Sequence, residues 1–538
     1  MCGLELLNIN ATSTYAAFDN QIINEELNAN AKPDHIVLTW SDDPKTTQTI
    51  SWRTDTSVNT AVVKYWEQGN RENTEKEAIV TAKSFSTSVE RGDTAGKMNL
   101  YSITLKNLKP GKTYCYEVGS GGLRGETNTF HTEELKKDNF KFIIFGDSQN
   151  NKINYNAWHD TVNNAYEANK DAKFIVNMGD LVEIGQKYIH WNNWFDASKG
   201  VIDSIPEMPI TGNHECKDAV GDGHGQPEYF LKQFNVFNNG PKGYKGKTYS
   251  YDYGNAHIAV LDSQLYDECS NLEEEQEMLR TQIAWLDNDL SKSKKLWKFV
   301  LYHKPQYYMK KDRTNSELKG LEAIFDKYHV DVVFNGHEHG LARTFPINKG
   351  EYKSKADQGT VYYITGRSNM NTKSDLSPKV WDSYYFDPQN LPVYETVEIR
   401  GSKLTIKAFE QNGNIVDDFV IDKANPQNNT LMVPSGRLGD TRMVLFGTPI
   451  VYGKKPVFEN NKWYVDFKLL LNFMDAKYNK EENSVSFKKP KVKVYVNDEM
   501  FKDSTRAMIS VEALKELGFS CEYQSSTNYL LIEKIKNG

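Results

Sequence analysis

Five short polar segments in the middle of the chain carry residue types that bind metals and move protons. Each contains Asp, Asn or His and directly follows a short apolar run. Carboxylates suit hard ions and imidazoles suit zinc, iron and similar ions, so the mixture predicts a site for two divalent or trivalent metals. The segments are Gly146-Asp147-Ser148-Gln149, Gly179-Asp180-Leu181-Val182-Glu183, Gly212-Asn213-His214-Glu215, Tyr302-His303-Lys304-Pro305 and Gly336-His337-Glu338-His339.

The apolar runs before these segments are typical of strands that are buried on both faces. Ligands collect at the carboxyl ends of such parallel strands, so we expect the five segments to meet in one crevice. Two spacings support this arrangement. Asp147 and Asp180 are 33 residues apart, as are Asp180 and Asn213, and this is the length of a strand–helix–strand unit. The predicted strands are residues 142–145, 174–176, 209–210, 299–301 and 332–334.

In their order and residue types, the five segments resemble the calcineurin-like metallophosphoesterase superfamily, and their flanks resemble its purple acid phosphatase branch. The resemblance covers residues 35–425 and implies two metal ions (Fe, Zn or Mn) as cofactors. It also implies a carboxylate that bridges the two ions. It assigns Asp147 and His339 to metal one, and Asn213, His303 and His337 to metal two. Asp180 is the carboxylate that bridges the two ions.

His214 and Arg343 are the candidate catalytic residues beside these ligands. The resemblance places His214 at the substrate, where it protonates the leaving group or stabilises the transition state; a His bonded to a backbone carbonyl is the alternative. Arg343 matches the Arg four positions after the last ligand, and Arg can grip phosphate through two parallel hydrogen bonds. A buried ion pair that supports the last ligand strand is the alternative for Arg343. Lys304 is a further candidate for steering an anion.

Two positions depart from the patterns of the superfamily. Glu183 stands where the purple branch has a metal-binding Tyr, and Gln149 stands where many non-purple relatives have His. Without the phenolate, the iron-loaded protein should show no purple absorption band. Both side chains stay candidate ligands for metal one through oxygens that favour Mn or Mg over Zn. The alternatives are that Glu183 only caps the following turn and that Gln149 contacts the ligand residues without binding the metal.

Length, composition, net charge and cysteine count limit the class of protein. A chain of 538 residues is too long for one core, and 38% hydrophobic with 25% charged residues is ordinary for a soluble globular protein. The net charge of −7 argues against a general nucleic-acid partner. No apolar run approaches the ~20 residues that span a bilayer. The five scattered cysteines favour free thiols over a disulfide framework, and a pair between Cys216 and Cys269 is left open.

Four segments follow one another along the chain. Residues 1–34 are a lead-in whose small residues at 10–17 resemble the end of a signal peptide, with a disordered start as the alternative. The first interpretation implies an extracellular or envelope location. Residues 35–134 resemble an all-β fibronectin type III sandwich, and residues 135–425 form the metallophosphoesterase domain, which the resemblance describes as two sheets packed between helix layers. Residues 430–538 form a small α+β domain.

Local patterns predict individual elements within these domains. The segment 108–118 resembles the fibronectin corner, in which a Tyr hydroxyl satisfies buried backbone and its ring packs on a Trp, here Trp52. Tyr249 to Asp262 reads as a hairpin that turns at Gly254. Apolar spacing predicts helices at 157–169, 188–201 and 272–290.

The tail contains a weak internal repeat of about 45 residues, in which 464–473 aligns with 508–517. It resembles the non-catalytic N-terminal repeat domain of copper amine oxidases and implies nothing about copper. From Thr430 onward, 17 Lys and Arg face 13 Asp and Glu, so the tail is +4 and the rest of the chain −11. A basic tail predicts contact with anionic cell-wall polymers, with a solvated surface as the alternative.

These observations predict a two-metal phosphoesterase that acts on small phosphomonoesters. A phosphodiesterase or a nucleotidase stays open because the same metals serve all three reactions. A surface-binding protein with a decayed site is the alternative from another class, suggested by Gln149, Glu183 and the appended tail.

Overall fold

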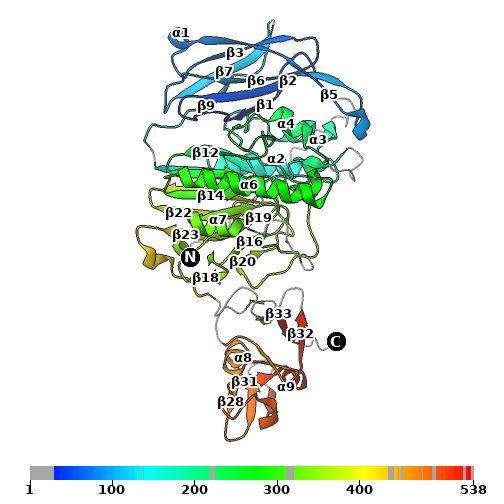
Figure 1. The fold of residues 1–538 in the computed structure, drawn as a ribbon, viewed down its shortest axis with the longest axis vertical. Coiled ribbons are helices and arrows are strands. Elements are labelled where there is room, and N and C mark those ends of the chain that lie inside the picture. Colours follow the sequence, from blue (N-terminus) through cyan, green and yellow to red (C-terminus); the bar gives the residue numbers. More distant parts are fainter. Residues whose placement is uncertain are drawn as a thin grey trace, which may run out of the picture.

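The computed structural model describes three units along the chain (Figure 1), and the predicted multidomain fold class is confirmed. A β-sandwich comes first, a layered α/β unit follows, and a small α+β unit ends the chain. The predicted lead-in lies outside the described residues up to residue 28. The described residues are 29–120, 122–136, 138–218, 225–310, 320–433, 441–445, 448–449, 454–474, 476–487, 492–524 and 529–534.

The first unit packs a four-stranded sheet on a five-stranded sheet. The Tyr114 hydroxyl accepts a hydrogen bond from the amide N–H of Lys109 at 2.9 Å, which is the predicted corner. The predicted ring partner is wrong: Trp52 stacks on Tyr101, its direct cross-strand neighbour, and Tyr114 stacks on Phe130. The sheets are β1 (Asp34–Thr39), β2 (Gln48–Thr54), β6 (Lys97–Leu105) and β5 (Lys83–Ser86), and β4 (Lys76–Thr81), β3 (Thr60–Glu67), β7 (Thr113–Ser120), β8 (Leu123–Arg124) and β9 (Asn128–His131).

The central unit packs two larger sheets face to face. The pairs β10–β11, β13–β14, β14–β15 and β15–β19 are parallel, as buried apolar runs predict. The five-stranded sheet has the order β11 (Ile175–Asn177), β10 (Asn139–Phe145), β21 (Val393–Arg400), β22 (Lys403–Glu410), β23 (Ile415–Asp422). The seven-stranded sheet has the order β12 (Tyr249–Tyr253), β13 (Ala256–Val260), β14 (Trp297–Leu301), β15 (Val332–Asn335), β19 (Val361–Thr365), β16 (Leu341–Thr344), β20 (Asp382–Phe386).

Four of the five predicted ligand-bearing strands form, and the hairpin 249–262 forms as β12 and β13. The run 209–210 is not a strand. The segment still runs beside β11: Glu207 forms an isolated parallel bridge with Ile175, and the Ile210 N–H donates to the Asn177 carbonyl at 2.9 Å. A run of two residues is too short to form its own ladder, but it still ends at the same edge of the sheet.

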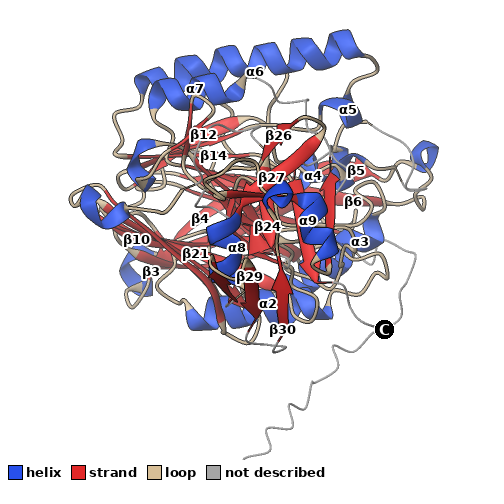
Figure 2. Cartoon of the chain, turned by 90° about the horizontal axis from the view of Figure 1, so that it is seen from below, coloured by secondary structure: helices blue, strands red, loops and turns tan. Residues whose placement is uncertain are grey.

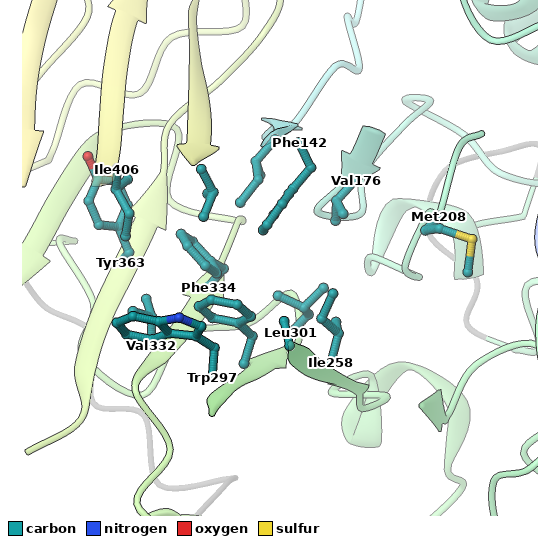
Figure 3. Packing of buried hydrophobic residues seen from close by; sticks show 14 of the residues in the cluster. Phe142, Val176, Met208, Ile258, Trp297, Leu301, Val332, Phe334, Tyr363 and Ile406 are labelled. Atoms are coloured by element: carbon teal, nitrogen blue, oxygen red, sulfur yellow. The ribbon is translucent and has the colours of Figure 1, made fainter. Parts of the chain in front are cut away.

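The core between the two sheets is apolar and closely packed (Figure 3). Phe142, Val176 and Ile406 from the five-stranded sheet face Trp297 and Phe334 from the seven-stranded sheet, and all five are fully buried. This packing holds the carboxyl ends of strands from both sheets at one edge of the unit, where the polar segments begin.

Helices cover the outer face of each sheet (Figure 2), as predicted for residues 157–169, 188–201 and 272–290. α2 (Asn156–Ala168) and α3 (Tyr188–Ser198) pack on the five-stranded sheet. α6 (Leu272–Lys292) and α7 (Leu321–Tyr328) pack on the seven-stranded sheet, on the opposite side of the unit. The short elements of the first two units are α1 (Arg71–Thr74), α4 (Glu228–Gln233), α5 (Leu265–Glu268), β17 (Ile347–Asn348) and β18 (Glu351–Tyr352).

The tail contains the predicted repeat as two strand–helix units. The strand of each unit leads directly into a helix that is capped by a side chain, Asp466 in one copy and Ser510 in the other. The two strands pair antiparallel around Val465 and Ile509, so the copies face each other. The elements are β24 (Arg442–Leu445), β25 (Thr448–Pro449), β26 (Val457–Glu459), β27 (Lys462–Asp466), α8 (Phe467–Phe473), β28 (Ala476–Asn479), β29 (Ser484–Phe487), β30 (Val492–Tyr495), β31 (Met508–Ser510), α9 (Val511–Glu516), β32 (Phe519–Gln524) and β33 (Tyr529–Lys534).

Residues 424–429, where the boundary before the tail was expected, are packed against the central unit. Pro426–Asn429 forms a 3-10 turn, and the Asn429 amide group is buried and bonded to Asp422 and Asp357. Leu431 continues this attachment because its N–H donates to the Ser354 carbonyl at 2.7 Å.

Candidate metal centre

Two groups of ligand-type side chains meet just beyond the carboxyl ends of β10, β11, β14 and β15. One group is Asp147, Asp180 and His339, and the other is Asp180, His303 and His337. Within each group the ligand atoms lie within 4.8 Å of one another. Asp180 belongs to both groups, which is the arrangement expected of a carboxylate that bridges two ions.

Individual distances show how tightly the groups converge. The Asp147 Oδ2 atom lies 3.3 Å from His339 Nε2, and Asp180 Oδ2 lies 3.1 Å from His303 Nε2. His337 Nδ1 lies 3.3 Å from His303 Nε2, and the His337 backbone N–H donates to Asp147 Oδ1 at 3.0 Å. Nitrogen and oxygen atoms at these separations are close enough to bind one metal ion as neighbouring ligands.

The backbone at the site adopts conformations that side chains disfavour. The φ angles are 22° at Asp147, 53° at Asp180, 74° at His337 and 60° at His339, all in the left-handed region. Such residues cost about 1–3 kcal/mol each and cluster at functional sites. Gly212 also permits a close approach, because a Cβ there would lie 2.2 Å from Asp180 Oδ1. The loops are therefore shaped for the ligands at the expense of local stability.

Backbone carbonyls orient two of the imidazoles. His303 Nδ1 lies 2.7 Å from the Met178 carbonyl oxygen, and His339 Nδ1 lies 2.5 Å from the Asn371 carbonyl oxygen. A carbonyl only accepts hydrogen bonds, so each Nδ1 carries a proton, and Nε2 is the ring atom left to bind a metal ion. Metal-ligating histidines are typically oriented in this way.

Glu215 connects the second and third polar segments, a role that the sequence analysis missed. Its carboxylate accepts hydrogen bonds from the backbone N–H groups of Gly212 at 2.7 Å, Leu181 at 2.8 Å and Asp180 at 2.9 Å. Its position directly after the Asn-His pair was the only signal available. Glu215 thus sets the position of Asp180 relative to Asn213.

The site contains buried oxygen atoms that have no hydrogen-bond partner among the described residues. They belong to the side chains of Asp147 (Oδ2), Gln149 (Oε1), Asn213 (Oδ1) and Glu183 (Oε2). Buried polar atoms are nearly always satisfied, so these unpartnered oxygens indicate a place for a cation or water. All four are oxygen acceptors, which fits metal ions.

The ionisation of the site residues points the same way. Burial lowers the pKa of His303, but the adjacent Asp180 and Asp147 carboxylates outweigh burial and raise it to about 9. Burial and the negative charge of Asp180 raise the pKa of Asp147 to about 8. Burial also holds the pKa of His339 well below its usual value. The carboxylates thus favour positive charge beside His303, and a metal ion would supply it there.

His214 lies beside the ligand groups without joining either of them. Its backbone N–H donates to Asp180 Oδ1 at 2.8 Å, and its Nδ1 lies 2.7 Å from the Glu183 carbonyl oxygen. Lys217 Nζ lies 3.0 Å from His214 Nε2. Burial, assisted by the positive charge of Lys217, lowers the pKa of His214. The imidazole is thus held through Nδ1, its Nε2 lies 3.7 Å from Asp180 Oδ2, and the Lys217 ammonium lies about equally close to both ring nitrogens.

Gln149 and Glu183, the two departures from the family patterns, occupy different places. Gln149 Nε2 lies 3.1 Å from His339 Nε2 and 3.3 Å from Asp180 Oδ2. Rotating the amide by 180° puts Oε1 in this position, where an oxygen ligand of metal one would stand. The Glu183 carboxylate instead faces His214 Nδ1 at 3.4 Å and Lys217 at 3.7 Å. The geometry therefore favours Gln149 over Glu183 as a ligand.

Arg343 and Lys304, the candidates for anion steering, are both held by carboxylates. Arg343 donates two parallel hydrogen bonds to Asp417, at 2.9 and 3.0 Å, and a third to Ser383. Lys304 Nζ lies 2.6 Å from Asp267. The geometry of Arg343 corresponds to the ion-pair alternative, since the guanidinium faces β23 and β20 and supports β16. Both cations are thus paired with carboxylates, and their part in anion steering stays a prediction.

No disulfide joins Cys216 and Cys269, because both are free thiols in the described structure. Cys216 is buried, and burial raises the pKa of its thiol well above the usual value. Among the described helices, none is long and apolar enough to cross a membrane.

Comparisons with known proteins agree with the fold and the ligand set. The purple acid phosphatase N-terminal domain family matches residues 33–132, and the calcineurin-like phosphoesterase family matches residues 140–341. Acid phosphatase type 7 of Mus musculus is 27% identical over 376 residues, covering 63% of this chain and 80% of that protein. The probable inactive purple acid phosphatase 27 of Arabidopsis thaliana is 23% identical over 424 residues, covering 69% of this chain and 67% of that protein.

A solved structure supports the fold on its own. The purple acid phosphatase from yellow lupin (Lupinus luteus) seeds superimposes with a TM-score of 0.60 at 16% identity, covering 76% of this chain and 78% of that one. The first two units of this chain, in this order, thus have counterparts in a known structure. The chain thus combines a purple acid phosphatase N-terminal domain at residues 33–132 with a calcineurin-like phosphoesterase domain at residues 140–341.

Proposed function

We propose that this chain is a metal-dependent phosphomonoesterase with two metal ions held by the residues that the sequence predicts. The observation that carries the proposal is the pair of ligand groups that share Asp180, together with the unpartnered oxygens around them. The acid phosphatases among the relatives support the reaction class. Asp147 and His339 would hold metal one, with Gln149 as a further oxygen ligand. Metal two would be held by Asn213, His303 and His337.

When bound, two such ions supply positive charge to a phosphate ester and make water acidic enough to attack near neutral pH. The ions are Fe, Zn or Mn, and the oxygen of Gln149 in place of imidazole favours Mn over Zn at metal one. Asn213 contributes a neutral oxygen, which leaves more net positive charge at metal two for the substrate.

His214 is the proposed proton donor to the leaving group. Its Nδ1 is fixed on the Glu183 carbonyl, so Nε2 is the atom that exchanges a proton. Lys217 lies within 3.0 Å of both ring nitrogens and would add positive charge near the leaving group. Glu183 then acts on His214 and Lys217 and has no direct role at metal one.

The proposal is tested by metal content and by hydrolysis of p-nitrophenyl phosphate and its bis ester. Chelation should abolish hydrolysis, and Mn, Zn or Fe should restore it. Iron-loaded protein should lack a purple band, because Glu183 is not a Tyr. Faster hydrolysis of the bis ester would favour a phosphodiesterase. Protein that binds two metals and hydrolyses neither ester would favour a decayed site, as the name of the Arabidopsis relative suggests for that protein.

We also propose an extracellular or envelope location, with the basic tail in contact with anionic wall polymers. The support is the +4 charge of residues 430–538, and the resemblance of that domain to copper amine oxidase repeats stays a prediction. Salt-sensitive sedimentation of the protein with purified cell walls tests the contact. Equal sedimentation of protein without the tail would contradict it.

A further inference from the structure

The segment 371–377, between β19 and β20, crosses beside the ligand groups and is held at both ends. At its start, the Asn371 carbonyl accepts a hydrogen bond from His339 Nδ1 at 2.5 Å. At its end, the Ser377 N–H donates to the Met309 carbonyl at 3.0 Å, and Leu376 packs against Met309. The crossing segment is therefore tied to a ligand on one side and to the loop after His303 on the other.

Lys373 lies in the middle of the crossing segment, two residues after the contact with His339. Its side chain is half-buried and makes no hydrogen bond or ion pair with any described residue. The neighbouring Asp375 faces Lys310 instead, at 3.6 Å. The Asn371 carbonyl that binds His339 Nδ1 is only two residues before Lys373, so the long lysine side chain lies within reach of the ligand group of Asp147, Asp180 and His339. No described residue uses the donors of its ammonium.

Two further lysines described near the site are already paired. Lys304 lies against Asp267, and Lys217 lies against His214 and Glu183. An ammonium group that no described carboxylate neutralises keeps its three donors available to a ligand that brings negative charge. The position of Lys373 beside the ligand groups makes the substrate the natural source of that charge.

We propose that Lys373 binds a terminal oxygen of the substrate phosphate and selects phosphomonoesters over phosphodiesters. A monoester has three terminal oxygens and carries nearly two negative charges at pH 7, whereas a diester has two terminal oxygens and one charge. With ions occupying both ligand groups, a third oxygen remains for a lysine only in the monoester. Lysine binds phosphate as a point charge, and this interaction strengthens with the charge of the phosphate. The inference rests on the proposed function and deepens it.

The test compares wild type with Lys373→Met, which keeps the length of the apolar stem and removes the charge. Titration calorimetry measures the Kd of inorganic phosphate for metal-loaded protein, independently of turnover. We expect this Kd to rise about 10- to 100-fold, the range for a lost hydrogen bond to a charged group. The KM for p-nitrophenyl phosphate should rise in parallel. For bis(p-nitrophenyl) phosphate, kcat/KM should change less than about threefold, and Lys373→Arg should recover most of the phosphate affinity.

Thr372→Met is the matched control, since it adds similar bulk at the adjacent exposed position of the same segment. Its phosphate affinity and metal content should equal those of wild type. An unchanged phosphate Kd in Lys373→Met, an equal loss for both esters, or loss of bound metal would each overturn the inference. If wild type binds phosphate through Lys373 but hydrolyses neither ester, the proposed function fails and the phosphate contact stands.

Discussion

Two buried histidines of the central unit each lie against carboxylates, yet their surroundings differ. His303 lies 3.1 Å from Asp180 at the ligand edge, and His257 lies 2.8 Å from both Asp252 and Asp289 near the opposite end of the strands. Burial lowers the pKa of each imidazole, and the carboxylates outweigh burial and raise both values to about 9. By protonation alone the two clusters are alike.

The clusters differ in backbone conformation and in satisfied hydrogen bonds. His257 lies within the regular strand β13, Ser250 donates a hydrogen bond to Asp289, and the polar atoms of this cluster have partners. The His303 cluster adjoins left-handed residues and buried oxygens without described partners. A shifted pKa marks a cluster of charges, while unsatisfied oxygens and backbone strain mark a place for a ligand.

The largest contrast should come from removing the shared carboxylate. Asp180→Asn should lower kcat/KM by about 10³-fold or more and reduce bound metal, since both ligand groups lose their common charge. His257→Gln is the matched control in the other cluster and should retain full metal content and activity. Metal analysis and steady-state kinetics on both variants check this. Comparable losses in the two variants would erase the distinction between the clusters.

His214→Ala should reduce turnover by about 10²- to 10⁴-fold, the usual contribution of a general acid or base. Bound metal should stay near that of wild type, because His214 joins neither ligand group. Single-turnover kinetics and metal analysis separate the two effects. A parallel loss of metal would make His214 a ligand or a support for one.

Gln149→Leu and Glu183→Ala should separate the two unusual positions at metal one. We expect Gln149→Leu to weaken metal affinity about 10- to 100-fold, the range for groups that ligate or orient ligands. Glu183→Ala should leave metal affinity unchanged and lower turnover, because its carboxylate faces His214. Competition with a chromogenic chelator measures both affinities. The reverse pattern would return Glu183 to the ligand set.

His257 should stabilise the folded protein most at low pH within its titration range. Its folded pKa of about 9 lies above the ordinary value of 6.5, so its contribution is fully present below pH 6.5 and is lost as pH rises through 9. The wild type should therefore lose roughly 2–3 kcal/mol of its stability advantage over His257→Gln across this range. Urea unfolding of both proteins at pH 6.5, 7.5 and 9 measures the difference. A difference that does not vary with pH would contradict the raised pKa.

The smallest effect should come from removing the tail. A protein that ends after Val433 keeps the attachment of Asn429 and Leu431 to the central unit. Its kcat/KM for p-nitrophenyl phosphate should stay within about threefold of wild type, because every candidate ligand lies upstream. If the shortened protein folds and binds two metals but has lost turnover, the tail contributes to the site.

The sequence by itself determined the ligand types and their place at strand ends. Apolar runs followed by Gly-Asp or Gly-His are local signals, since the strand and the loop after it are set by neighbouring residues. The same holds for the helices α2, α3 and α6, for the hairpin β12–β13 and for the capped helices of the tail. These features need no knowledge of partners from distant parts of the chain.

Only the tertiary structure decided which partner each polar side chain meets. Arg343 pairs with Asp417, 74 residues away, and the register of β2 against β6 gives Trp52 to Tyr101. Lys373 comes next to the ligand groups because the Asn371 carbonyl accepts from His339. Side-chain partners depend on strand order, register and loop course, and these are fixed by packing over the whole domain. The sequence therefore predicts which residues form the metal centre, and the fold determines which side chains near it are already paired with other residues.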